Sequence, residues 1–188
     1  MFRTASLSTK LIRIGASLLV VALASISLTL WVTWQLEGGA AAVNEAGRMR
    51  MQTWRLASAV QTSLSPASLG SLVSQFDDSL KLLRTGDPSR PLFVPWDDDV
   101  DVKFAEVDRI WTQRRGQWLA AAPMSATESV MAAEEFVTAI DALVLSIEQQ
   151  LSRLTAILNL FQFVMMALAI IGAVVMLFTG YMYVINPL

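Results

Sequence analysis

Two long stretches without charged residues constrain the fold of this chain more than any other feature. Residues 14–36 are a run of 23 residues without a charge, and residues 154–188 are a run of 35. A bilayer core of about 30 Å needs about 20 helical residues, so each run is long enough to span a membrane. We therefore expect transmembrane helices at 11–36 and 156–184. A signal peptide is the alternative for the first run, but its apolar part is too long and a convincing cleavage site is missing.

Basic residues predict the orientation of these spans. Arg3, Lys10 and Arg13 precede the first span without any acidic residue, which indicates a cytoplasmic N-terminus over residues 1–10. A second span then returns the C-terminus to the cytoplasm. The intervening domain, residues 37–155, holds all 16 acidic residues and 11 of the 14 basic ones. If the source is a Gram-negative bacterium, we expect the protein to lie in the inner membrane, in contact with lipid. The intervening domain would then be periplasmic.

The residue types that are missing limit the chemistry. The chain has no cysteine and no histidine, which removes disulfides, thiolate metal sites, the usual general base and the commonest metal ligand. We therefore expect no catalytic residues, no cofactor, no metal and no nucleic-acid partner. The triplet Asp97, Asp98 and Asp99 could bind calcium, but a glycine-containing loop with further calcium ligands is missing around it. Alternatively, the three carboxylates lie at a helix N-terminus, where negative charge is favourable.

Hydrophobic periodicity predicts an all-α fold, an antiparallel four-helix bundle flanked by the two transmembrane helices. The first helix is expected to continue through Gly38 and Gly39. The connection 86–99 contains three prolines but is also apolar, so we expect it to pack over one end of the bundle. Ser125 and Glu128 form a capping box for the last helix. The four helices are expected at 11–61, 67–84, 101–121 and 127–185.

The segment 43–57, VNEAGRMRMQTWRLA, has two adjoining helical stripes. We expect one stripe to face the bundle and the other to face a second copy of the chain, with Arg50 at that seam. An arginine in such a position can also reach solvent or pair with an acid from a neighbouring helix. Arg48 and Arg55 lie on other faces, towards solvent or headgroups. The first stripe is Val43, Gly47, Arg50, Trp54 and Ala57, and the second is Ala46, Met49, Thr53, Leu56 and Val60.

Arg50 has the chemistry of an anion ligand. Its guanidinium is planar, always charged and matched to planar oxyanions, and Gly47 opens space one helical turn away. Across a two-fold axis two copies of Arg50 would repel each other, and a bound anion would remove that repulsion. Ligand binding at the seam would then shift the helices that continue into the membrane.

The same segment resembles the P-box of nitrate/nitrite sensor histidine kinases of the NarX/NarQ type, a motif shared more loosely with PilJ-like chemotaxis transducers. The resemblance implies a parallel homodimer that holds one nitrate between two P-box helices. Arg50 would bind the anion, and Gly47, Ala46 and Val43 would shape the pocket. Arg48 departs from the motif, and its role stays undetermined. The matching positions are Asn44, Ala46, Gly47, Arg50, Met51, Gln52, Arg55 and Leu56, and the supporting residues are Asn44, Met51, Trp54 and Arg55.

The C-terminal sequence TGYMYVINPL resembles the exit of a second span into a HAMP linker, with Pro187 opening residues 185–188 as its start. We therefore expect the chain to be the sensor and membrane part of a longer receptor, without a catalytic domain of its own. Its downstream partners would be a kinase and a response regulator.

Three hypotheses follow for function. The first is the sensor module of a two-component histidine kinase that binds nitrate, or nitrite, outside the membrane and signals through helix displacement. The second is the input domain of a PilJ-like chemotaxis transducer with the same fold. The third is a structural membrane-anchored bundle that recruits a partner. The residues leave open the identity of the anion and the direction of the signalling motion.

Overall fold

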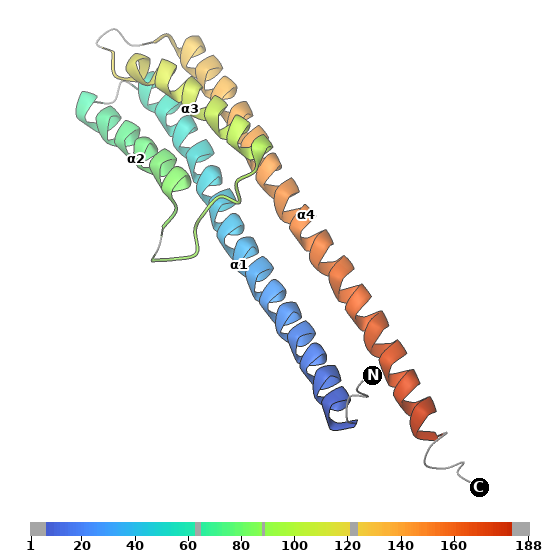
Figure 1. Ribbon diagram of the computed structural model, residues 1–188. Helices are drawn as coiled ribbons and strands as arrows, with labels where there is room; N and C mark the ends of the chain where they lie inside the picture. Colours follow the sequence, from blue (N-terminus) through green and yellow to red (C-terminus); the bar gives the residue numbers. More distant parts are fainter. Residues whose placement is uncertain (1–6, 63–64, 88, 121–123, 182–188) are drawn as a thin grey trace. The chain divides into compact units, whose positions relative to one another are not determined.

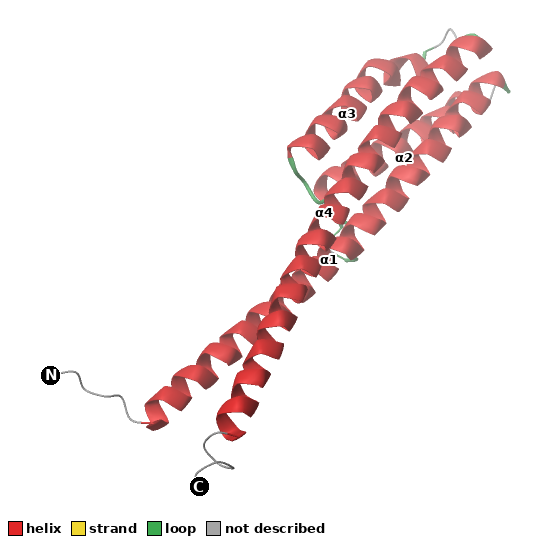
Figure 2. Cartoon of the chain, turned by 90° about the vertical axis from the view of Figure 1, so that its right-hand side faces the viewer, coloured by secondary structure: helices red, strands yellow, loops and turns green. Residues whose placement is uncertain are grey.

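The computed structural model describes residues 7–62, 65–87, 89–120 and 124–181, and over these residues the chain is all-α (Figures 1 and 2). Four helices are packed as a bundle, and the two terminal helices are long and apolar. This confirms the predicted fold class. The helices are α1 (Leu7–Gln61), α2 (Pro66–Thr85), α3 (Asp98–Trp118) and α4 (Ala126–Gly180).

The ends of α2 and α3 are set by local caps. Pro66 begins α2 because proline fits the first helical turn, and the Ser65 side chain caps it by accepting a hydrogen bond from Ser68 N at 3.3 Å. The helix α3 begins three residues earlier than predicted, because the carboxylate of Asp97 accepts from Val100 N at 2.8 Å. It ends at Trp118, whereas we predicted an end near 121, and residues 121–123 lie outside the described residues.

The predicted capping box at the start of α4 is confirmed. Ser125 N donates to Glu128 Oε2 at 2.8 Å, and Glu128 N donates to Ser125 Oγ at 3.2 Å. The helix α4 is described as far as Gly180, and its predicted end near 185 lies outside the described residues. The predicted linker start at 185–188 lies outside the described residues, as do residues 1–6 of the predicted cytoplasmic N-terminus.

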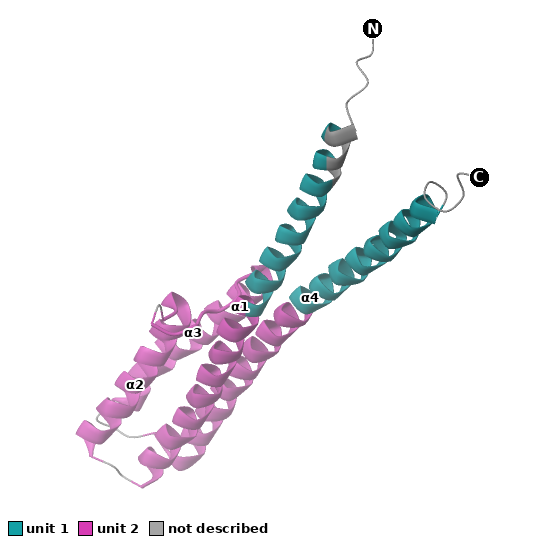
Figure 3. Ribbon diagram, turned by 90° about the horizontal axis from the view of Figure 1, so that it is seen from below, with its two compact units in different colours: residues 1–33, 153–188 teal, residues 34–152 magenta. Residues whose placement is uncertain are grey.

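The chain divides into two compact units, residues 1–33 with 153–188 and residues 34–152 (Figure 3). In the first unit, the described parts of α1 and α4 expose large apolar side chains, such as Leu18 at 62% and Met176 at 75%. Both helices contain a stretch long and apolar enough to cross a membrane. Such continuous apolar surface is stable in lipid rather than in water, so the unit is consistent with a membrane protein.

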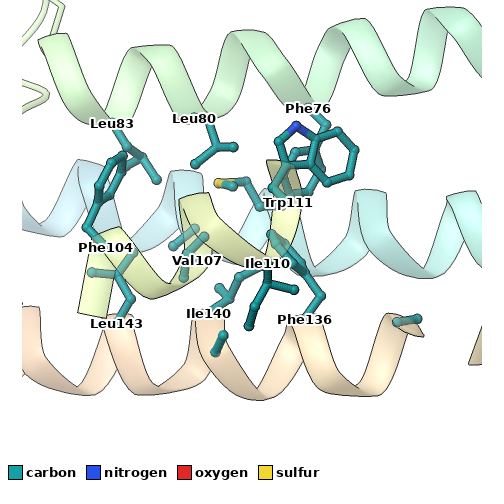
Figure 4. Close-up of a cluster of buried hydrophobic side chains, with 14 of the residues drawn as sticks. Phe76, Leu80, Leu83, Phe104, Val107, Ile110, Trp111, Phe136, Ile140 and Leu143 are labelled. Atoms are coloured by element: carbon teal, nitrogen blue, oxygen red, sulfur yellow. The ribbon is translucent and has the colours of Figure 1, made fainter. Parts of the chain in front are cut away.

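The second unit, residues 34–152, has a core to which all four helices contribute (Figure 4). Phe76 of α2 is fully buried, and its ring centroid lies 4.0 Å from that of Trp111 on α3 and 5.0 Å from that of Phe136 on α4. Trp118 is also buried, so both tryptophans of α3 are core residues. Other buried members are Met49 and Leu56 of α1, Leu80 and Leu83 of α2, Val107 and Ile110 of α3, and Ile140, Leu143 and Ile147 of α4.

The connection between α2 and α3 packs on the bundle, as predicted. Leu92 and Val94 are each 2% exposed. Phe93 lies against α1, where its ring centroid is 4.1 Å from that of Trp34. Gly86 ends α2 with φ of 71°, a conformation that glycine adopts without strain. The apolar residues of the connection therefore close one side of α1.

The helix α1 continues through Gly38 and Gly39, and at both positions another side chain packs directly against the helix backbone. A Cβ at Gly38 would overlap the ring of Phe93, and a Cβ at Gly39 would lie 2.6 Å from Leu151 Cδ2 of α4. The glycines thus let the connection and α4 approach the α1 backbone closely. That contact compensates for the helix propensity that glycine lacks.

Candidate ligand-binding site on the first helix

The segment 43–57 of α1 presents one face to the bundle core. Ala46, Met49 and Leu56 are fully buried, and Thr53 is 2% exposed. Val60 is partly buried against the same core. The stripe that begins at Ala46 is therefore the bundle face, as the periodicity indicated. Ala46 itself points into the core.

The stripe that begins at Val43 lies at the edge of that face. Val43 and Gly47 are half-buried, Trp54 is 44% exposed, and Ala57 is buried. Next to this stripe Met51 is 56% exposed. Asn44 and Arg55 are also exposed. The structure therefore leaves a surface strip on α1 in which apolar Met51 and Trp54 flank Arg50.

Arg50 is held by one exposed ion pair. Its Nη1 donates to Asp141 Oδ1 of α4 at 2.8 Å, and the two side chains are 41% and 52% exposed. Ion pairs of this exposure contribute about 0–1 kcal/mol, because solvent screens them. No second hydrogen-bond acceptor for the guanidinium is found among residues 7–62, 65–87, 89–120 and 124–181. The remaining N–H groups of Arg50 can therefore bind an anion.

Gly47 lies beside the guanidinium. A Cβ placed on Gly47 would be 3.7 Å from Arg50 Nη2, an ordinary van der Waals distance. The backbone at Gly47 is thus bare where an anion would bind to Nη2. A larger side chain there would occupy this space.

Asp141 is the partner of Arg50 that the sequence did not identify. We had considered an acid from a neighbouring helix as a partner of Arg50, but 91 positions separate the two residues. The available signal was that Asp141 follows Ile140, a core position of α4, and so lies at the edge of the α4 core face. This pattern predicts on which face of α4 Asp141 lies, but it does not predict which residue of α1 lies opposite Asp141.

Arg48 belongs to a polar network between α1 and α2. Its Nη2 donates to Oε1 of Glu45, which is only 4% exposed, and to Ser79 Oγ at 3.2 Å. Ser79 Oγ in turn lies 3.4 Å from Gln52 Oε1. We expected Arg48 to face solvent or headgroups, and its side chain is indeed exposed. Its guanidinium also neutralises the buried carboxylate of Glu45. Arg48 therefore supports the α1–α2 contact.

A second charged cluster joins α2 and α3. Asp77 accepts from Trp111 Nε1 at 2.8 Å and from Arg115 Nη2 at 2.8 Å. Burial of the Asp77 carboxyl acts to raise its pKa, but the hydrogen bonds from Arg115 and Trp111 outweigh burial and leave the pKa below its usual value. Because the pKa is lower in the folded state, ionised Asp77 stabilises the fold above the unfolded-state pKa of about 3.9. That contribution disappears as the pH falls through the folded-state pKa.

We expect Asp77→Asn to lower the free energy of unfolding at pH 7 by about 1 kcal/mol, a value reduced for the partial exposure of this pair. The difference from the wild type should shrink below about pH 4, because Asp77 of the wild type then also loses its charge. Denaturant unfolding between pH 7 and pH 3 measures it. Asp78→Asn, at an exposed neighbour, is the control and should change stability by less than about 0.5 kcal/mol. A difference that stays constant with pH would contradict the assignment.

Acidic residues do not form a metal site in the described part of the chain. No group of three or more acidic side chains with suitable geometry occurs there. Asp97 caps α3, and Asp98 and Asp99 lie in its first turn, where negative charge is favourable. The helix-terminus interpretation of the triplet is therefore the one that the structure supports.

Comparison with protein families identifies the domain. Residues 31–143 match the family described as Type IV pili methyl-accepting chemotaxis transducer N-term (PilJ). The chain belongs to this family. More than half of the sequence is matched, from the part of α1 that enters the bundle to the core positions of α4. No curated protein matches the chain.

The PilJ family match gives the coarse function. The chain carries a sensor input domain of a signalling receptor, flanked by two long apolar helices, and the matched domain is not a catalytic one. It favours the second hypothesis, an input domain of a PilJ-like transducer, over the sensor of a histidine kinase. The segment 43–57, with Arg50, lies inside the matched region.

Proposed function

We propose that this PilJ-type domain is the periplasmic, ligand-binding input module of a bacterial two-span receptor, and that Arg50 binds a small planar oxyanion such as nitrate. The observation that carries the proposal is the environment of Arg50. Its guanidinium lies beside bare backbone at Gly47, and among the described residues its one partner is the exposed Asp141. A pair worth about 0–1 kcal/mol is readily exchanged for an anion that accepts more hydrogen bonds.

The strip around Arg50 also suits a second copy of the chain. Met51 and Trp54 are large apolar side chains that a parallel homodimer would bury next to the two facing arginines. An anion shared between the two copies of Arg50 would relieve their repulsion. The proposed ligand site is therefore completed by the homodimer, with Val43 and Gly47 at its edge.

Continuity of the helices gives the proposal a route for the signal. Arg50 lies on α1 and Asp141 on α4, and each helix is unbroken from that residue into its apolar terminal part. An anion that replaces Asp141 at the guanidinium would break this ion pair between α1 and α4, while the buried core still holds the two helices together. A displacement of either helix at the site would then pass along it as a rigid element.

Nitrate titration by calorimetry on the chain in lipid nanodiscs tests the role of Arg50. We expect saturable binding, at least tenfold weaker in Arg50→Gln because a charge-assisted hydrogen bond is worth about 1.5–3 kcal/mol. Asp141→Asn should bind several-fold more tightly, because the competing carboxylate is gone. Arg114→Gln is the matched control, since Arg114 pairs across helices with Glu135 at 2.6 Å and similar exposure. Equal affinity in Arg50→Gln and the wild type would contradict the proposal.

Crosslinking in the same samples separates a sensor from a structural bundle. The chain has no native cysteine, so Met51→Cys introduces a single reactive thiol on the proposed dimer strip. A sensor should show nitrate-dependent crosslinking yield that Arg50→Gln abolishes. A purely structural bundle predicts a yield that nitrate leaves unchanged.

The output of the receptor has two candidates. The PilJ match favours a chemotaxis or pilus-type transducer, and the resemblance of the segment 43–57 to the P-box keeps a sensor histidine kinase as the second candidate. The sequence encoded downstream of Leu188 distinguishes them. A long coiled-coil rod supports the first, and a kinase core supports the second.

A further inference from the structure

A cavity of about 440 Å³ opens between α1 and α2, whereas Arg50 of α1 pairs with α4. Its apolar lining is Ala59 and Leu72, which are 1% and 7% exposed and belong to the bundle core. The two helices run antiparallel, because Arg48 contacts Ser79 of α2, whereas Arg55, later on α1, shares the cavity with the earlier Ser71. Arg55 lies two helical turns after Arg48 on α1 and lines the cavity together with residues of α2.

The charge of this cavity is unbalanced. Arg55 is its only charged lining residue among those that the structure describes, and it makes no ion pair or hydrogen bond with any of them. The groove between α2 and α3 is different, because three basic and three acidic residues line it and Arg115 there binds Asp77. The cavity at Arg55 therefore has a cation for which the described chain provides no counter-charge. A solvent-exposed guanidinium in a recess of this kind attracts anions.

Hydrogen-bond donors line the same cavity as Arg55. The cavity is also lined by Ser58, Ser68, Ser71 and Gln75. Ser71 Oγ accepts from Gln75 Nε2 at 3.3 Å, so the hydroxyl hydrogen of Ser71 remains to be donated. The second amide hydrogen of Gln75 is likewise available. A guanidinium with hydroxyl and amide donors, and without a carboxylate among the described lining residues, is the donor set that an oxyanion needs.

The position of Arg55 on α1 separates this cavity from the Arg50 site. Five residues correspond to about 140° around a helix, so the two side chains leave α1 on different faces. Arg50 reaches α4, whereas Arg55 lines a cavity with α2. Each site can therefore be removed without the other.

We propose that the α1–α2 cavity is a second anion site, in which Arg55 and Ser71 bind a small oxyanion, either inorganic or a carboxylate. The site lies within one copy of the chain, and it does not rest on the nitrate proposal. An anion bound there contacts α1 and α2 together and so ties the end of α1 to the neighbouring helix. The position of α1, the helix that also carries Arg50, then depends on this ligand.

The test measures anion binding to the full chain in lipid nanodiscs, with sodium sulfate and sodium acetate as separate probes and sodium chloride at matched ionic strength as the reference. We expect saturable binding of at least one probe by calorimetry. Arg55→Gln should weaken it about tenfold or more, and Ser71→Ala should weaken it about threefold or more. The two probes distinguish a tetrahedral inorganic anion from a carboxylate ligand.

Two variants keep the test specific. All titrations are repeated in the Arg50→Gln background, which removes anion binding at Arg50, and Arg55→Gln should weaken the remaining binding to the same extent there. Arg109→Gln, which removes an exposed arginine of α3, controls for the loss of one positive charge. Equal binding in Arg55→Gln and the wild type overturns the proposal, and so does the absence of saturable binding for both probes. Loss of binding in Arg109→Gln would reduce the effect to net charge and also overturn it.

Discussion

Phe76→Ala is expected to lower the free energy of unfolding by about 3–5 kcal/mol, the largest effect of any substitution proposed for this domain. Phe76 is fully buried and contacts an aromatic ring on each of two other helices, Trp111 of α3 and Phe136 of α4. Its removal leaves a cavity where α2, α3 and α4 meet, and these rings are too rigid to fill it.

Denaturant unfolding followed by tryptophan fluorescence measures this loss, with Trp111 as a reporter next to the cavity. Met131→Ala is the control, because Met131 lies on α4 but is 63% exposed. It should change the free energy of unfolding by less than about 0.5 kcal/mol. A loss below about 1 kcal/mol in Phe76→Ala would show that the three helices do not share this aromatic core.

Gly38→Ala and Gly70→Ala should have opposite effects although the chemical change is the same. Alanine at Gly38 would overlap the ring of Phe93, which must then leave its contact with Trp34. We expect a net loss of about 1–2 kcal/mol, since overpacking outweighs the gain in helix propensity. At Gly70 of α2 the space around a new Cβ is open, so alanine should stabilise the domain by about 0.5–1 kcal/mol.

Thermal unfolding of both variants by circular dichroism gives the sign of each effect. Restoring the space with Phe93→Ala in the Gly38→Ala background should recover part of the helix-propensity gain, as expected for two residues in direct contact. Stabilisation by Gly38→Ala alone would mean that the α2–α3 connection does not rest on α1. The function of Gly38 would then be flexibility rather than close packing.

The ion pair of Arg50 can break without unfolding the domain. The pair with Asp141 is too exposed to hold α1 and α4 together by itself, and the buried side chains of the core supply that contact. Losing the pair therefore costs the fold little. The proposed anion would thus replace Asp141 at Arg50 while the bundle stays folded, which is what a reversible sensor requires.

The fold was largely readable from the sequence because its signals are local. The apolar runs, the period of the segment 43–57 and the capping box at Ser125 involve residues within a few positions of each other, and they predict helices directly. The errors were at helix ends. The carboxylate of Asp97 starts α3 three residues early, and this choice between adjacent aspartates depends on which one takes the capping conformation.

The sequence by itself determined the helices, the bundle face of α1 and the chemical character of Arg50. Only the tertiary structure decided which residues meet across helices: Asp141 with Arg50, Ser79 with Arg48, and Ser71 in the same cavity as Arg55. The physical reason is that cross-helix pairing depends on how far each helix is rotated and shifted against its neighbour. The whole core sets these quantities at once, whereas helical periodicity depends on residues three or four positions apart.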